Sequence, residues 1–283
     1  MASRASRILL LITVLAGLTG LAVTLHYIHL GLTLTHYDAR GHLIVARRIF
    51  DSITPGWEQI GAVWLPLPHL LNALPVQNDW LYRTGAFAIA LSILCYAVSA
   101  GALAWIVRTL TGSWWPAVAA ASVFAFNPNV LYLQATPMTE PLLIVLLLVA
   151  MALLMDWVER SAHPGLTGWA FALACLTRYE AWPVTAAAVT LACLARWQRR
   201  HSFRQALLDV IPIAIVPAAA GAAFIVFSKI VIGSWFASDF FVPENPAQGL
   251  PYQAVKEIVW GVRELSGLWL VVAGAAGILV LAV

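Results

Sequence analysis

The sequence contains little charge. Of its 283 residues, 10% are charged and 61% are hydrophobic, whereas soluble domains carry about 25% charged and roughly 45–50% apolar residues. This balance excludes an ordinary soluble domain and predicts an integral membrane protein, so chain length does not estimate the number of domains. The formal net charge of +3 says little about partners, because the placement of the basic residues matters more than their sum.

Cysteine and short catalytic signatures are also scarce. Cys95, Cys175 and Cys193 lie in apolar segments without CxxC spacing, which argues against a disulfide framework and predicts small core hydrophobes. The sequence has no Walker A loop, no GxGxxG after a strand and no GxSxG elbow. The absence of these motifs argues against nucleotide-dependent chemistry on the cytoplasmic side.

Long apolar runs are what the sequence does contain, and a membrane-spanning helix needs about 20 mostly apolar residues. The first run is longer than the ~7–15-residue core of a signal peptide and lacks a clean cleavage site, so we interpret it as a retained span, with a cleaved signal as the alternative. The expected spans are residues 8–30, 81–107, 114–126 with an extension to 133, 141–158, 210–232 and 268–283.

Residues 166–195 form a long apolar run that is interrupted in its middle. Arg178, Tyr179 and Glu180 stand there, and Pro183 follows. The segment is either two short helices that meet at these residues or one kinked segment. Irregular backbone at membrane depth is tolerated only where it is buried in protein or lines a cavity.

Basic residues predict the orientation. A cytoplasmic N-terminus puts Arg108, Arg160 and the arginines of 196–204 on the inside. We interpret the arginines of 196–204 as a positive-inside anchor and not as a nucleic-acid-binding patch. We therefore expect one all-α transmembrane domain over residues 1–283 in the cell (plasma) membrane, with its polar segments outside. Because the chain stops within an apolar run, we also expect that a C-terminal part is missing. The polar segments are 36–69, 127–140, 178–180 and 233–256.

The external loop, about residues 31–80, should contain amphipathic helices. Residues 38–50 have helical spacing, and Asp38 and His42 are i and i+4, so they share a face. Arg47 and Asp51 have the same spacing and could pair. Trp57, Trp64 and the WLPLP sequence predict an extended return to the second span. The expected apolar stripe of the helix is Leu43, Ala46 and Phe50.

Ionisable residues stand at the outer helix ends. Asp38 closely follows the first span and suits a general base, although Asp is also a favoured helix N-cap. Glu140 opens the fourth span, where the helix dipole favours an acid in any case. Arg178 and Glu180 interrupt an apolar segment, where ionisable residues are usually functional or mutually paired. Their i,i+2 spacing disfavours pairing on a continuous helix, so we expect Arg178 to meet an anion.

Histidines are concentrated in the same region. His36, His42 and His69, together with Asp38 and Glu140, match neither HExxH nor a comparable metal signature. Each histidine is therefore interpreted as an interfacial polar residue, and no metal site is predicted.

The pattern as a whole resembles a known class. An N-terminal span precedes a large external loop that opens with Asp38, Glu140 stands before the fourth span, and residues 176–178 read Leu-Thr-Arg in a short hairpin. This resembles the integral-membrane glycosyltransferases of the GT-C class, which include protein O-mannosyltransferases and the lipid A aminoarabinose transferase. Many members have a paired acidic motif in the first loop, whereas here Ala39 or Arg40 replaces the second acid.

The resemblance implies transfer of a sugar from a polyprenyl-phosphate donor to an acceptor hydroxyl at the outer membrane face, with inversion. It implies that Asp38 is the catalytic base. Because phosphate leaves readily, the enzyme mainly has to deprotonate the acceptor and stabilise the departing anion. No cofactor or nucleic acid is expected, and the acceptor stays open. The expected substrate-binding residues are His42, Arg48, His69, Glu140, Arg178 and Lys229.

Three alternatives remain at this point. An oligosaccharyl transferase would need a divalent metal and further acidic motifs. A transporter or lipid flippase would also place ionisable residues in broken helices, but the sequence shows no internal repeat and its polar residues gather at one face. A non-catalytic membrane subunit would use the loop to bind a partner.

Overall fold

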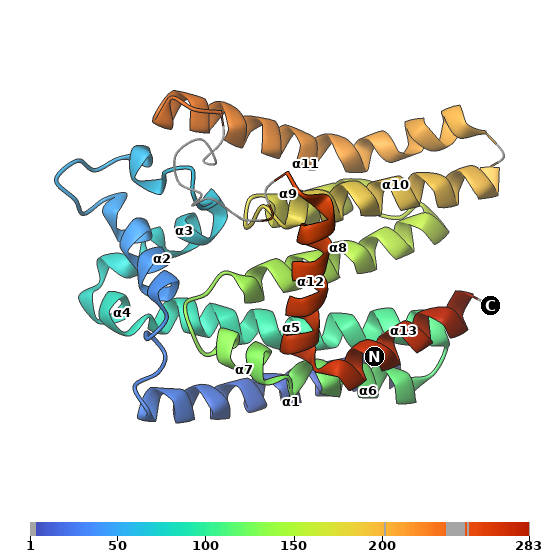
Figure 1. Cartoon of the computed structure of the whole chain (residues 1–283), viewed down its shortest axis with the longest axis horizontal. Coiled ribbons are helices and arrows are strands. Elements are labelled where there is room, and N and C mark those ends of the chain that lie inside the picture. Colours follow the sequence, from blue (N-terminus) through green and yellow to red (C-terminus); the bar gives the residue numbers. More distant parts are fainter. Residues whose placement is uncertain (1–3, 201, 236–246, 248, 283) are drawn as a thin grey trace. The chain divides into compact units, whose positions relative to one another are not determined.

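The computed structural model describes residues 4–200, 202–235, 247 and 249–282. Regular structure within these residues is entirely helical (Figure 1), which confirms the all-α prediction. The chain divides into two compact units, Met1–Phe236 and Ala237–Val283. The second unit contains α12 (Pro251–Ser266) and α13 (Leu268–Ala282). The first contains α1 (Arg4–His29), α2 (Tyr37–Arg48), η1 (Trp57–Ile60), α3 (Pro66–Ala73), η2 (Pro75–Gln77), α4 (Asp79–Thr84), α5 (Ala86–Thr111), α6 (Trp114–Ala125), α7 (Pro128–Gln134), α8 (Glu140–Arg160), α9 (Pro164–Cys175), α10 (Ala181–Arg200) and α11 (Phe203–Ile232).

Among the described residues, four helices, α1, α5, α8 and α11, are long and apolar enough to cross a membrane. Two bent pairs raise this number to six if each pair crosses as one span, namely α6 with α7 at 63° and α12 with α13 at 110°. By helix length and composition, the chain is therefore a multi-pass membrane protein. The bend between α6 and α7 lies at Asn127-Pro128, across which the third span was expected to extend to residue 133. The Asn127 side chain caps α7 by accepting from the backbone N–H groups of Asn129 and Val130.

Residues 166–195 form two helices, so the first of the two predicted arrangements is confirmed. α9 ends at Cys175 and α10 begins at Ala181, with a turn at 176–180 between them. The Trp182 indole N–H donates to the Cys175 carbonyl over 2.9 Å, which satisfies one of the acceptors left open at the end of α9. The Thr177 hydroxyl donates to the Leu173 carbonyl in the same way.

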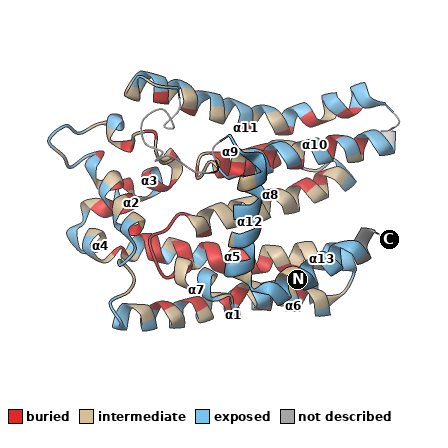
Figure 2. Ribbon diagram, viewed as in Figure 1, coloured by how far each residue is buried: buried red, intermediate tan, exposed pale blue. Residues whose placement is uncertain are grey.

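The helix α5 is the most deeply packed of the spans, and Figure 2 shows buried residues along most of its length. Ala100 and Ala104 of α5 are buried, as are Ala16 and Gly20 of α1. Small residues let two helices approach closely. At Gly101 an added methyl group would collide with the Thr13 hydroxyl, so this glycine marks the tightest part of the crossing.

A second core joins α8, α9, α10 and α11. Phe171 of α9 is fully buried between Trp157 of α8, Ala192 of α10 and Ile213 of α11. Gly168 of α9 lies against the backbone of α11, where a methyl group would be 3.0 Å from the Ile213 carbonyl. This packing holds the α9–α10 hairpin, and with it the 176–180 turn, in a fixed place.

The external segment folds differently from the prediction in two places. The helix α2 is present and buries Leu43 and Ala46, but Phe50 lies beyond its end and is 50% exposed, so the predicted stripe is wrong at that residue. The WLPLP sequence is not an extended return, because α3 begins at Pro66. Proline at the first helical position is preorganised for a helix, and its missing N–H has no helical partner there.

Two further boundaries need correction. The second span was expected from Leu81, but α4 ends at Thr84, Gly85 has φ 66° and α5 begins at Ala86. A left-handed glycine at this point ends one helix and starts the next in a new direction. Half of the predicted outer loop 233–256, namely residues 236–246 and 248, lies outside the described residues, and α12 begins within the loop at Pro251.

Candidate functional site

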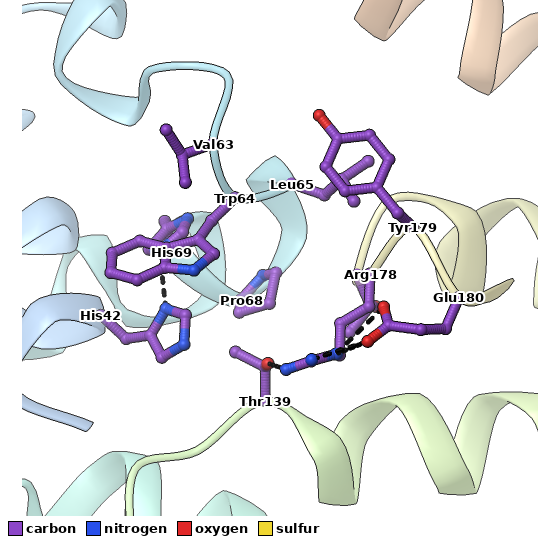
Figure 3. A pocket seen from close by; sticks show the side chains of 11 residues that line it. His42, Val63, Trp64, Leu65, Pro68, His69, Thr139, Arg178, Tyr179 and Glu180 are labelled. Atoms are coloured by element: carbon purple, nitrogen blue, oxygen red, sulfur yellow. Dashed lines mark hydrogen bonds and ion pairs between the residues drawn. The ribbon is translucent and has the colours of Figure 1, made fainter. Parts of the chain in front are cut away.

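A cavity of about 260 Å³ opens where the 176–180 turn meets the external segment and the start of α8 (Figure 3). It is built by the parts of the chain whose polar residues stand out in the sequence. Its lining residues are His42, Val63, Trp64, Leu65, Pro68, His69, Thr139, Thr177, Arg178, Tyr179 and Glu180.

Two hydrogen bonds hold the external segment against the turn. The Leu67 backbone N–H donates to the Leu176 carbonyl over 2.9 Å, and the Tyr179 hydroxyl donates to the Ala62 carbonyl over 2.8 Å. Buried backbone groups in loops need such partners. These bonds fix one wall of the cavity relative to the other.

Arg178 is the centre of a charged network. Its Nη1 donates to Glu140 Oε1 over 2.8 Å and to Thr139 Oγ1 over 3.0 Å. Its Nη2 donates to Glu180 Oε1 over 2.7 Å, and its Nε reaches the same carboxylate at 3.2 Å. Glu180 stands two residues after Arg178, a spacing that disfavours pairing on a continuous helix, but both residues lie in a turn. Within the described part of the chain, these contacts leave the second Nη2 hydrogen for a ligand.

The surrounding carboxylates keep Arg178 charged. Burial acts against the charged form, but the hydrogen bond with Glu180 and the attraction of Glu140, Glu180 and Asp38 outweigh it and raise the pKa of Arg178. Burial likewise opposes the charge on Glu180, and the hydrogen bond from Arg178 overcomes this and lowers the pKa of Glu180. A permanent cation therefore stands at the rim of the cavity.

Asp38 lies in the first turn of α2, within electrostatic range of Arg178. It is not the N-cap of this helix. The cap is His36, whose Nδ1 accepts from the backbone N–H of Asp38 over 3.2 Å. The capping explanation of Asp38 is therefore wrong. Asp38 is partly buried and lies one helical turn before His42.

His42 and His69 form a buried pair. His42 Nδ1 and His69 Nε2 lie 3.1 Å apart, and the two residues are 6% and 0% exposed. Burial, followed by repulsion from His69, Arg178 and His36, lowers the pKa of His42 to about 3. Burial also lowers the pKa of His69 to about 4. Both rings are therefore neutral at pH 7.

Trp64 covers the histidine pair from the cavity side. Its indole ring lies 4.3 Å from the His42 ring and 6.0 Å from the His69 ring, measured between centroids. Gly41 permits this approach, because a methyl group there would come within 2.7 Å of Trp64 Cη2. The external segment thus contributes an aromatic and imidazole wall.

Four of the predicted residues, Asp38, Arg48, Glu140 and Lys229, are not among the lining residues. Arg48 is exposed at the end of α2. Lys229 is exposed on α11, where it donates to the Gly233 carbonyl and lies over the Trp235 ring. Arg47 pairs with Asp51 over 2.7 Å, as predicted, and also with Asp79.

Sequence reasoning missed several residues of the lining. Thr139 directly precedes Glu140, and its position before a span was the available signal. Tyr179 lies between two residues that were considered and was itself given no role. Trp64 was read as an interfacial residue, because nothing in the sequence reveals its contact with His42.

The site does not contain an evident metal centre. Among the residues that the structure describes, no group of three or more His, Cys, Asp and Glu side chains is arranged to hold a metal ion. The two histidines face each other and the carboxylates face Arg178. Comparison of the chain with family models, curated proteins and solved structures gave no match.

Proposed function

We propose that the chain is an inverting membrane glycosyltransferase that moves a sugar from a polyprenyl-phosphate donor to an acceptor hydroxyl at the outer membrane face. The observation that carries this proposal is the placement of Arg178, which lines the cavity, is paired with Glu140 and lies within electrostatic range of Asp38, although the three residues belong to separate segments. A carboxylate near a cation supplies the base and the anion-binding group that such a transfer needs.

In the proposed reaction, Asp38 accepts the proton of the acceptor hydroxyl. The oxygen forms a bond to the anomeric carbon, and the bond between that carbon and the phosphate oxygen breaks, with its electron pair leaving on the phosphate. The free Nη2 hydrogen of Arg178 binds this phosphate, while Glu140 and Thr139 hold the guanidinium in place. Arg48 and Lys229 stand apart from the lining and have no part in these steps.

An apolar cavity beside the site supports a lipid donor. It measures about 380 Å³ and lies between α10 and α11, with Trp182, Pro217 and Gly221 among its lining residues. The Trp182 ring packs edge-on against Tyr179, which lines the polar cavity, at a centroid distance of 5.4 Å. When the phosphate of the donor binds Arg178, its hydrocarbon chain would lie in the apolar cavity between α10 and α11.

Replacing Asp38 with Asn tests the proposal. Membranes that contain the full chain are incubated with labelled polyprenyl-phosphate sugars, and movement of the label to any acceptor is followed. We expect wild-type membranes to transfer label and Asp38→Asn to reduce transfer by about 10²-fold or more, with unchanged binding of the lipid. Asp51→Asn is the matched control, because Asp51 pairs with Arg47 outside the cavity.

Three outcomes would contradict this function. Wild-type membranes that move the lipid across the bilayer without breaking the sugar–phosphate bond would indicate a flippase. Equal transfer activity of Asp38→Asn and Asp51→Asn would show that Asp38 is not the catalytic base. Absence of both transfer and lipid binding would favour a non-catalytic subunit.

A further inference from the structure

The wall opposite Arg178 carries no charge. Figure 3 shows His42 and Trp64 on one side of the cavity and Arg178, Tyr179 and Glu180 on the other. The histidine pair is neutral, and the indole is apolar apart from its N–H. A ligand with an anionic end and a neutral, hydroxyl-bearing end would match the two sides of this cavity.

The contact between the two histidines uses one nitrogen of each ring. His42 Nδ1 and His69 Nε2 lie 3.1 Å apart, so one of these nitrogens donates and the other accepts. The other nitrogen of His69, Nδ1, is buried and has no hydrogen-bond partner among the described residues.

The contact with His69 occupies Nδ1 of His42. A neutral imidazole has one donor and one acceptor nitrogen, so Nε2 of His42 meets a ligand in the role that Nδ1 does not take. This edge of the ring points into the cavity (Figure 3). His69 thus acts as a positioning residue that fixes the orientation of His42.

We propose that His42 and Trp64 form the subsite for the sugar ring of the donor, in which His42 Nε2 forms a hydrogen bond with a ring hydroxyl and the Trp64 indole packs on the apolar face of the ring. This inference rests on the proposed function and deepens it. Aromatic rings with a few placed polar groups are the usual construction of small-molecule sites. The subsite separates sugar recognition from phosphate recognition at Arg178.

The size of the cavity limits the ligand. About 260 Å³ is slightly below the roughly 300–1,000 Å³ of common small-molecule sites, which fits one sugar ring and not an oligosaccharide. The subsite therefore favours a monosaccharide donor whose hydroxyl faces His42.

Binding of two lipids to the purified full chain tests the subsite. One lipid is a polyprenyl-phosphate monosaccharide and the other is the same polyprenyl phosphate without the sugar. We expect His42→Ala and Trp64→Leu each to weaken binding of the sugar-bearing lipid by about tenfold and to leave binding of the bare lipid unchanged. His42→Gln, which keeps an acceptor on a side chain of similar reach, should recover part of the loss. The matched control is His29→Ala, at an exposed histidine at the end of α1.

The possible failures are distinguishable. If the wild-type chain binds neither lipid and transfers no sugar, the proposed function is contradicted. If it binds both and transfers sugar, but the His42 and Trp64 variants weaken both lipids equally or neither lipid, only the subsite is overturned. His42→Ala leaves His69 without its partner, so the folding of this variant is checked by thermal unfolding. If His42→Ala does not fold, the lipid binding of Trp64→Leu tests the subsite.

Discussion

Arg178 is balanced by carboxylates before any ligand arrives. Glu140 and Glu180 contact it directly, and Asp38 acts on it from α2. A phosphate that binds Arg178 must therefore use its free hydrogen or compete with Glu180, whose side chain is 61% exposed. Exposed ion pairs contribute little net energy, so Glu180 is the contact that a stronger anion would displace, while the more buried Glu140 continues to hold the guanidinium.

The histidine pair predicts a loss of stability in acid. Histidine in an unfolded chain has a pKa of about 6.5, whereas burial lowers the pKa of His42 to about 3 and that of His69 to about 4. The unfolded state then binds more protons, so this stability is present above the unfolded pKa and is lost as the pH falls towards the folded values. Between pH 7 and pH 5 we expect a loss of about 2 kcal/mol for each histidine, measured by unfolding of the chain in detergent.

Replacing both histidines separates this effect from other acid-sensitive groups. The neighbours that face the pair are Arg178 and His36, and both remain in the double variant His42→Gln/His69→Asn. This variant should be less stable at pH 7 but should lose less stability than the wild type on going to pH 5. A double variant with the wild-type pH dependence would contradict the assignment, and His29→Gln serves as the exposed control.

At the residue scale, the sequence predicts contacts that follow from spacing and not those that need the tertiary fold. Asp38 and His42 share a face because they are one helical turn apart, and the pairing of Arg47 with Asp51 follows the same rule. His42 and His69 are 27 residues apart, and no spacing rule joins them. The Arg178–Glu180 pair was disfavoured for a continuous helix, and it forms because the backbone turns there.

At the element scale, two prolines open helices that the sequence analysis did not place. The third span was expected to continue past Asn127-Pro128 to residue 133, whereas the structure bends there by 63° and begins α7 at Pro128. In WLPLP the same residue type was read as extended chain, whereas Pro66 opens α3. Proline is compatible with a helix start and with extended chain, and only the packing of α3 against α2 separates the two. This packing brings His69 to His42.

The crossing of α1 and α5 gives a prediction about an element. In Gly101→Ala, the new methyl group collides with the Thr13 hydroxyl, which itself donates to the Leu9 carbonyl. We expect a loss of about 1–3 kcal/mol, typical of overpacking in a dense core, measured by thermal unfolding in detergent. In the double variant Thr13→Ala/Gly101→Ala the nearest remaining side-chain atom is Cβ of residue 13 at 3.6 Å, an ordinary contact.

The double variant should therefore recover most of the stability that Gly101→Ala loses. Gly165→Ala is the control, because a methyl group there meets nothing within 4 Å. If Gly101→Ala is as stable as Gly165→Ala, the helices are not held as closely as the structure shows.

At the scale of the first unit, the two ends of α8 mark two different surfaces. Glu140 at its start contacts Arg178. At its other end, Arg196 stacks over Trp157 and donates to Ser161. The sequence predicted this separation from the placement of unusual polar residues and plain arginines. It could not predict the cavity itself, because the cavity depends on how the external segment packs on the 176–180 turn.

The orientation of these two ends across the membrane is the remaining prediction. The excess of arginine around the end of α8 that Arg196 of α10 contacts predicts that this end is cytoplasmic and that the cavity faces outward. We place single cysteines at Ile53, which is fully exposed near the cavity end, and at Ser202, which is exposed between α10 and α11. The native cysteines are buried, so an impermeant maleimide should label Ile53→Cys on intact cells and Ser202→Cys only after permeabilisation. The opposite labelling would place the cavity in the cytoplasm and exclude a donor presented at the outer face, whereas labelling of both on intact cells would contradict the separation of the two ends.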